Sequence, residues 1–277
     1  MNRHEIFNNI ISKKSFLCIG LDTDINKIPK HLSSYEDPVF EFNKQIIDST
    51  IDLAVAFKVN TGFYESRGIK GWISLEKTFN YLNKFKKQIF TIADAKRGDI
   101  GNTSEQYAKA FFDFNSSGFD FDAVTVVPYM GEDSVRPFLS FKNKWVVLLA
   151  LTSNNGSDDF QNLELNNKKK LFETVISKSS KWGNEDNMMF VVGATKTEEF
   201  RKIRNIIPNH FLLVPGVGTQ KGNLYEVAKY GMNKQCGLLV NASRSIIYAS
   251  NNIDFAEKSR KQALKIQQEM KNILEDL

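Results

Sequence analysis

The stretch WVVLLAL, residues 145–151, is apolar at every position. A strand that faces water on one side alternates apolar and polar residues, so a continuous apolar run indicates a strand buried on both faces, as in parallel sheets. Similar runs recur along the whole chain: FLCIGL (16–21), LAVAFKV (53–59), IFTIA (89–93), AVTVV (123–127), MMFVVGA (188–194), FLLVPGV (211–217) and GLLVNA (237–242). Together they predict eight parallel strands.

The gaps between these runs carry helical patterns. Apolar residues within 75–85 recur at steps of three and four, as on one face of a helix. Thr103 stands three residues before Gln106, which is the spacing of a capping box. Asn223 and Asp254 stand where caps of two later helices are expected. Strands and helices therefore alternate along the chain.

The length and composition narrow the fold class further. The chain has 277 residues, of which 42% are hydrophobic and 25% charged, as in ordinary globular proteins. Eight strand–helix repeats in this length predict an α/β protein, a (β/α)8 TIM barrel that forms one domain over residues 1–277, rather than an open sheet. No apolar run reaches the roughly 18 residues of a membrane helix, and the N-terminus lacks the apolar segment of a secretion signal. We therefore expect a soluble, cytoplasmic protein.

The content of cysteine and histidine limits the kinds of metal site. The two cysteines, Cys18 and Cys236, lie in or beside apolar runs, where a buried thiol is expected. Two cysteines exclude a disulfide framework and a cysteine-based metal site. The three histidines argue against a histidine-rich zinc or iron site.

One long polar stretch, TSNNGSDDFQNLELNNKKK (152–170), interrupts the pattern after the fifth run. Loops of more than about 12–15 residues in compact domains are usually functional or disordered. We interpret most of this stretch as a solvated surface excursion. Thr152, Ser153 and Asn154 are the exception, because they directly follow a strand end, where the active sites of barrels lie. A lid over the site is the alternative.

Charged and polar side chains follow most of the apolar runs. In a barrel, the carboxyl ends of the strands meet at one face, and this face carries the active site. Such side chains are costly to bury unless they are paired or functional. They are Asp22, Lys58, Asn60, Asp94, Lys96, Ser153, Gln220 and Arg244.

The densest group of charges is DAKRGDIGNT, residues 94–103. Asp94 and Lys96 are two residues apart, so in a strand they point to the same face. Asp99 follows after a glycine, and Lys58 from the neighbouring strand adds a second ammonium. Alternating charges at about 4 Å attract by roughly 4 kcal/mol at an effective dielectric constant near 20, before desolvation. Such an array would hold a lysine as a positioned proton donor; an ordinary salt-bridge network is the alternative.

Two turns near the C-terminus, PGVGTQKGN (215–223) and NASRS (241–245), resemble anion sites. Gly218 lets backbone N–H groups approach an anion, and the predicted helix that follows directs its positive end toward it. Arg244 can bind phosphate through two hydrogen bonds. The turns therefore predict a phosphate monoester as substrate. For Gly222, a purely conformational role in a tight turn remains open.

These motifs resemble the orotidine 5′-phosphate decarboxylase family over nearly the full chain. The matching segments are LCIGLD, FKVN, DAKRGDIGNT, PGVGTQ and NASRS. The long polar stretch after the fifth run is similar to the longer, bacterial-type branch. The resemblance implies cofactor-free decarboxylation of orotidine 5′-monophosphate (OMP) to uridine 5′-monophosphate (UMP) and carbon dioxide. This lyase reaction is the last step of de novo pyrimidine (UMP) biosynthesis.

The resemblance also implies a catalytic tetrad of Lys58, Asp94, Lys96 and Asp99. Asp94 would lie against the substrate carboxylate, and Lys96 would protonate the C6 carbanion that is left when carbon dioxide departs. In the family, Asp99 and Thr103 reach the site of the neighbouring subunit, which implies a homodimer. For Thr103, the capping-box position is an alternative explanation.

The substrate-binding residues implied by the resemblance come from most of the strand ends. Asp22 and Lys58 would hold the ribose hydroxyls, Ser153 would contact the pyrimidine, and Gln220 and Arg244 would hold the phosphate. Pro215, Gly218 and Thr103 are further substrate-binding residues, Thr103 in the site of the neighbouring subunit. No metal and no cofactor are expected.

Two other functions are compatible with parts of the sequence. Mg-dependent sugar-phosphate decarboxylases and hexulose-phosphate aldolases have a similar D-x-K-x-x-D, in which Asp94 and Asp99 would serve the metal ion; Lys58 would repel that ion. A non-catalytic anion or nucleic-acid binding protein is suggested by the net charge of +5 and the lysine run at 168–170. No zinc-finger or RNA-recognition motif accompanies the run. We therefore expect a small nucleotide substrate, and neither a nucleic-acid nor a membrane partner.

Overall fold

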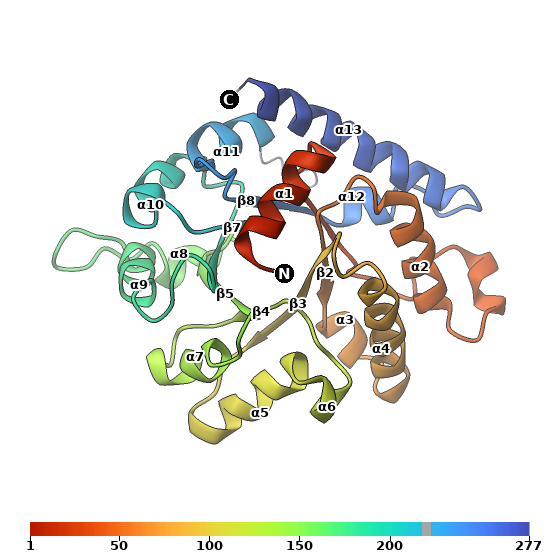
Figure 1. Cartoon of the computed structure of the whole chain (residues 1–277), viewed down its shortest axis with the longest axis horizontal. Coiled ribbons are helices and arrows are strands. Elements are labelled where there is room, and N and C mark those ends of the chain that lie inside the picture. The colour runs from red at the N-terminus through yellow and green to blue at the C-terminus, as the bar shows by residue number, and fades with distance from the viewer. Residues whose placement is uncertain (218–222, 277) are drawn as a thin grey trace. The chain divides into compact units, whose positions relative to one another are not determined.

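The structure, a computed structural model, describes residues 1–217 and 223–276. In this part of the chain eight parallel strands close into a barrel in sequence order (Figure 1). The predicted (β/α)8 TIM barrel is confirmed, and each of the eight apolar runs overlaps one strand. Strand β2 extends one residue beyond its run, and β3 extends four residues beyond its run, so that Asp94 and Lys96 lie inside the strand. The strands are β1 Leu17–Gly20, β2 Ala56–Asn60, β3 Phe90–Arg97, β4 Ala123–Val126, β5 Trp145–Leu151, β6 Met188–Val192, β7 Leu212–Pro215 and β8 Leu238–Ala242.

Helices lie between the strands and at both ends of the chain. The longer α-helices are α1 Arg3–Lys13, α2 Pro38–Thr50, α4 Ile69–Asn83, α5 Gly101–Phe112, α7 Glu132–Leu139, α9 Leu171–Ser179, α10 Phe200–Ile206, α11 Leu224–Gly231 and α13 Phe255–Glu275. Single turns are α3 Gly62–Glu65, α6 Phe114–Ser117, α8 Ser157–Phe160 and α12 Arg244–Ile247, with the 3-10 segments η1 Lys30–Ser34 and η2 Thr197–Glu199. No helix among the described residues is long and apolar enough to cross a membrane.

The chain divides into two compact units. The first holds Met1, Arg3–Ala95 and Asn241–Leu277, and the second holds Asn2 and Lys96–Val240. The assignment of residues 1–277 to one domain stays a prediction.

In the first unit, β2 pairs with both β1 and β3. Lys58 is in register with Gly20 on one side and with Ile92 on the other. Around these strands, α2 lies beside α13 (Figure 1), and the ring of Phe42 stacks on that of Phe255 at 5.0 Å between centroids. This packing joins segments far apart in the sequence.

In the second unit, β4, β5, β6 and β7 pair in order. The largest buried side chain at the start of β5 is Trp145, which is 1% exposed. The β5–β6 register shifts between Leu149 and Leu151, just before the strand end that carries Ser153. Helices α5 and α7 pack on each other, as do α10 and α11 (Figure 1).

Three local predictions have different outcomes. The cap at Asn223 is confirmed, because its side chain accepts a hydrogen bond from the N–H of Glu226 at 3.2 Å. The capping box at Thr103 is wrong. Helix α5 begins at Gly101, where φ is 54°, so Thr103 lies inside the first turn, and no side chain caps this end. Asp254 is the N-cap residue of α13, but its side chain makes no capping hydrogen bond.

The polar stretch after β5 lies mostly at the surface, as expected, since Ser157 is its one buried residue, but it also contains regular structure. It contains α8, and Ser157 at the start of that turn is fully buried. Gln161 accepts a hydrogen bond from the N–H of Thr152 at 2.7 Å, which ties the stretch back to the end of β5. The stretch ends in a β-bridge between Glu164 and Lys170.

Candidate active site

Lys58, near the end of β2, is the centre of a cluster of charges in which Lys58 and Asp94 are buried and Asp22 is half-buried. Its side chain is 6% exposed, and its Nζ lies 2.8 Å from Oδ2 of Asp94 and 3.4 Å from Oδ1 of Asp22. Burial alone would lower the pKa of Lys58, but the attraction of Asp94 and Asp22 outweighs it and raises the pKa above the usual value. Lys58 is therefore an ammonium at neutral pH, held between two carboxylates.

A network of buried hydrogen bonds supports the chain segment around Asp22. The hydroxyl of Thr23 donates to Oδ1 of Asn43 at 2.6 Å, and the amide of Asn43 donates to the hydroxyl of Tyr64 at 2.8 Å. Tyr64 in turn donates to the carbonyl of Leu21 at 3.1 Å. Burial raises the pKa of Tyr64, which keeps it a neutral donor. The residues on both sides of Asp22 are thus fixed before any ligand binds.

Tyr248 holds the same segment from the other end of the chain. Its hydroxyl donates to the carbonyl of Asp22 at 2.9 Å and accepts from the N–H of Asp24 at 2.7 Å. Burial raises the pKa of Tyr248 to about 12, so the hydroxyl keeps its proton. Tyr248 directly follows α12, so the helix turn that begins at Arg244 is joined to the loop of Asp22.

Gly20 lets the segment before Arg244 approach β1 closely. A Cβ atom on Gly20 would lie 1.9 Å from Oγ of Ser243, so any larger residue would displace this serine. Arg244 follows it as the first residue of α12, and its side chain is exposed to solvent. The guanidinium is thus available to a ligand.

Lys96 and Asp99 belong to the second unit. Lys96 is exposed, and its φ of 49° places it in the left-handed region. The alternation that predicts a common direction for Asp94 and Lys96 assumes extended backbone, so it does not apply at this residue. Asp99 is half-buried, and its Oδ1 accepts a hydrogen bond from the N–H of Ile100 at 2.8 Å. Thr103 is exposed on α5.

The remaining predicted site residues lie after β5 and β7. Ser153 follows β5 and packs against Gly193, where a Cβ atom would come within 2.8 Å of the serine Cβ. Gly193 is therefore required for Ser153 to keep its place. Pro215 is the last residue of β7. Gly218 and Gln220 lie outside the described residues.

Comparison with known proteins agrees with the motifs. A model of the Orotidine 5′-phosphate decarboxylase / HUMPS family matches residues 15–259. The chain belongs to this family. It is 59% identical over 275 residues to an orotidine 5′-phosphate decarboxylase of Flavobacterium johnsoniae, with 99% of each chain covered. A protein of the same name from Phocaeicola vulgatus is 58% identical, again with 99% of each chain covered.

A solved structure of this family agrees with the fold. The OMP decarboxylase of Leishmania donovani is 31% identical and superposes with a TM-score of 0.79, with 97% of this chain and 100% of that chain covered. The resemblance inferred from the five sequence segments is thereby confirmed. The roles of single residues remain predictions.

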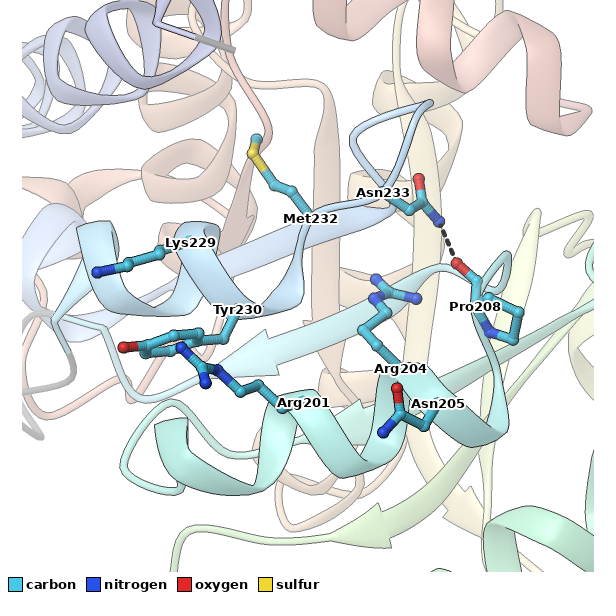
Figure 2. Close-up of a pocket in the computed structure, with 8 residues that line it drawn as sticks. All are labelled: Arg201, Arg204, Asn205, Pro208, Lys229, Tyr230, Met232 and Asn233. Atoms are coloured by element: carbon cyan, nitrogen blue, oxygen red, sulfur yellow. Dashed lines mark hydrogen bonds between the residues drawn. The ribbon is translucent and has the colours of Figure 1, made fainter.

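A cleft between α10 and α11 is lined by none of the residues predicted for the active site (Figure 2). It is lined by Arg201, Arg204, Asn205, Pro208, Lys229, Tyr230, Met232 and Asn233. Arg204 donates hydrogen bonds to four backbone carbonyls, those of Ile207, His210, Gly231 and Gly237. The Arg201 guanidinium lies 4.3 Å from the centre of the Tyr230 ring. These contacts fix the turns that lead into β7 and β8, and we assign the cleft to the stability of the fold.

Sequence reasoning missed the residues that support the site. Thr23, Asn43 and Tyr64 lie in different segments, so nothing in their spacing predicts a hydrogen-bonded network. Tyr248 stands four residues after Arg244, a helical spacing that could have indicated a shared face. Gly193 lies within a run read only as a strand.

Proposed function

We propose that this protein decarboxylates OMP to UMP and carbon dioxide, with Lys96 as the proton donor to C6. The reaction is that of the family, and relatives that cover 99% of the chain bear its name. The protein is accordingly a carboxy-lyase of pyrimidine biosynthesis. The structural observation that carries the proposal is the cluster in which Lys58 pairs with Asp22 and Asp94. Asp94 precedes Lys96 by two residues in the chain.

The cluster supplies charge that is fixed before the substrate arrives. Decarboxylation at C6 leaves a carbanion with little resonance stabilisation, so the enzyme must stabilise charge electrostatically. Asp94 is held by Lys58 at 2.8 Å and does not have to reorganise during the reaction. If Asp94 lies next to the substrate carboxylate, the two negative charges repel each other and raise the free energy of the bound substrate. The repulsion is weaker in the transition state, in which the negative charge moves from the carboxylate toward C6.

Lys96 supplies the proton. An ammonium near C6 stabilises the developing carbanion and then transfers its proton to the same carbon, so one group performs both tasks. Lys96 is an exposed residue, as a group that meets a ligand must be before binding.

The substrate-binding residues hold the parts of OMP that do not react. We assign Asp22 and Lys58 to the ribose hydroxyls, Ser153 to the pyrimidine and Arg244 to the phosphate. The assignments of Pro215 and Gln220 to substrate binding rest on the family resemblance alone, whereas that of Gly218 rests also on the anion-binding turn predicted from the sequence. Binding energy from the phosphate can position the reacting ring.

The magnesium-dependent alternative fits the charges less well. Lys58 occupies a position 2.8 Å from Asp94, where an ammonium competes with a cation for the same carboxylate. The nucleic-acid alternative loses part of its support too, because Lys170 of the lysine run pairs with the buried Glu199 at 2.6 Å.

The test is the loss of OMP absorbance after addition of the purified protein in excess EDTA. Conversion to UMP is expected, and the product is identified by chromatography. Conversion only after magnesium is restored would favour the metal-dependent alternative. Absence of conversion in both conditions would overturn the proposed reaction and favour a non-catalytic role.

We also propose that the protein is a homodimer in which Asp99 and Thr103 complete the site of the neighbouring subunit. Both belong to a surface with exposed apolar side chains: Ile100 is 57% exposed, Tyr129 89% and Met130 45%. The terminal methyl of Met130 would lie 3.4 Å from a Cβ on Gly98, which places this patch beside the Asp99 loop. Apolar groups gathered in this way are typical of protein interfaces.

Mixing two inactive variants tests the shared site. Lys96→Ala and Asp99→Asn subunits are denatured together, refolded and assayed. If Asp99 acts across the interface, a mixed dimer contains one intact site, and about a quarter of the wild-type rate returns, because half of the random dimers are mixed. No gain over the separate variants, in a mixture shown to be dimeric, would place Asp99 in the site of its own chain.

We infer a cytoplasmic location from the two cysteines. Cys18 and Cys236 are both free and buried, as expected in a reducing compartment. Cell fractionation tests this inference, and recovery of the activity outside the cytoplasmic fraction would contradict it.

A further inference from the structure

The backbone of Lys96 is unusual for its place in the fold. Lys96 lies within the bounds of β3, yet its φ is 49°. Residues with a side chain avoid this region because Cβ crowds the following carbonyl, and such a conformation persists only where the surroundings impose it. The contacts on either side of Lys96 therefore decide where its side chain starts.

Contacts to the next strand hold Lys96 on both sides. Its N–H donates to Oγ1 of Thr125 on β4 at 2.9 Å. One residue further, the carbonyl of Arg97 accepts from the N–H of Val127 at 2.9 Å. A contact to helix α5 adds to these bonds, because the Arg97 guanidinium lies 5.6 Å from the centre of the Tyr107 ring. In a regular parallel ladder the N–H of a residue pairs with a backbone carbonyl of the neighbouring strand, but here a side-chain hydroxyl is the acceptor.

Thr125 is a polar residue in an otherwise apolar strand. Strand β4 has the sequence AVTV, and Thr125 is 1% exposed. A buried hydroxyl is costly without a hydrogen bond, whereas valine would fill the same space with no such cost. The threonine is therefore better explained by the bond to Lys96 than by packing.

We propose that Thr125 is a positioning residue for proton transfer. Its hydroxyl holds the N–H of Lys96 and so fixes the left-handed turn from which the amine reaches C6. The proposal rests on the proposed function of Lys96. It assigns Thr125 no contact with the substrate, so its loss should slow proton transfer without weakening binding.

The test compares Thr125→Val, which removes the acceptor and keeps the shape, with Thr125→Ser, which keeps the acceptor. For Thr125→Val we expect kcat to fall by about 10- to 100-fold, the range for a misplaced catalytic group, with KM for OMP and Kd for UMP unchanged within about twofold. Thr125→Ser should keep kcat close to that of the wild type.

A buried threonine elsewhere in the fold provides the control. Thr50 on α2 is 0% exposed, and its hydroxyl donates to the carbonyl of Ile46 at 2.6 Å. Thr50→Val should change Tm at most and leave kcat unchanged. A fall in kcat shared by Thr50→Val or Thr125→Ser would overturn the proposal, because it would show a general structural effect.

Two further variants separate the possible failures. If Thr125→Val does not fold, Thr125→Ala is compared with Thr125→Ser, which carries the hydroxyl that Thr125→Ala lacks. Equal kcat values for these two variants would overturn the proposal.

Lys96→Ala is assayed in parallel. If it is inactive while Thr125→Val keeps the wild-type kcat, only the role of Thr125 is wrong. If Lys96→Ala remains active, the proposed function of Lys96 itself fails, and with it the positioning role.

Discussion

The two charged residues near the end of β3 differ in almost every physical respect. Asp94 is 8% exposed, in extended backbone, and paired with a buried ammonium. Lys96, two residues later, is exposed and has left-handed backbone. The contrast is between a charge that is buried and held by an ion pair, at Asp94, and a charge on an exposed residue whose backbone is in the left-handed region, at Lys96.

Removal of the accessible lysine should have the largest effect on activity. For Lys96→Ala we expect kcat to fall by about 1000-fold or more, since general acid catalysis contributes about 10²–10⁴-fold and the electrostatic contribution is lost too. Affinity for UMP, measured by calorimetry, should persist because the proposed phosphate-binding residue, Arg244, is a different one, and the free energy of unfolding should stay near that of the wild type. Turnover at the wild-type rate would remove Lys96 from the mechanism.

Removal of the buried lysine should instead affect both stability and activity. Lys58→Met leaves Asp22 and Asp94 without their common counter-ion, and loss of one partner of a buried pair costs about 3–5 kcal/mol of unfolding free energy. Urea denaturation measures this value, and kcat should fall as well. Lys261→Met, which removes an exposed partner of Glu257, is the control and should leave stability nearly unchanged. Equal stability of the two variants would contradict the role of the buried cluster.

A variant of Arg244 tests whether phosphate binding is separate from the roles of Lys58 and Lys96. Arg244→Ala should lower the affinity for UMP by about 10- to 100-fold, which corresponds to the loss of one or two charge-assisted hydrogen bonds. Affinity for uridine, which has no phosphate, should be unchanged. Similar losses for UMP and uridine would place the phosphate elsewhere.

The smallest effect is expected from a thiol-specific reagent, which should leave Cys18, beside Lys58, and Cys236 unmodified in the native protein. Burial raises the pKa of Cys18 to about 12, and the same cause raises the pKa of Cys236 to about 12. Since the thiolate is the reactive form, both groups should remain protonated and unmodified by a disulfide reagent at pH 8. Both should react after denaturation. Rapid modification of Cys18 in the native protein would show that the interior near Lys58 opens to solvent.

Sequence patterns predicted the number and order of the strands better than the local backbone at their ends. Each of the eight runs overlaps one strand, and Asn223 caps α11 as expected, but β3 extends four residues beyond its run. The capping box at Thr103 fails because α5 begins at Gly101, and the alternation argument fails at Lys96 because its φ is positive. Both errors follow from local rules that assume regular backbone in a segment that is irregular.

The barrel follows from the sequence alone, because continuous apolar runs separated by helical patterns can bury both faces of a strand only in a sheet that helices cover. The sequence also shows which charged residues stand at the strand ends, because their order in the chain sets their place in the fold. The tertiary structure decided which of them pair. The contact of Lys58 with Asp94 and Asp22, the support of Asp22 by Tyr248, and the bond from Lys96 to Thr125 all join residues that are distant in sequence. Such contacts depend on register and packing between strands, which no local pattern encodes.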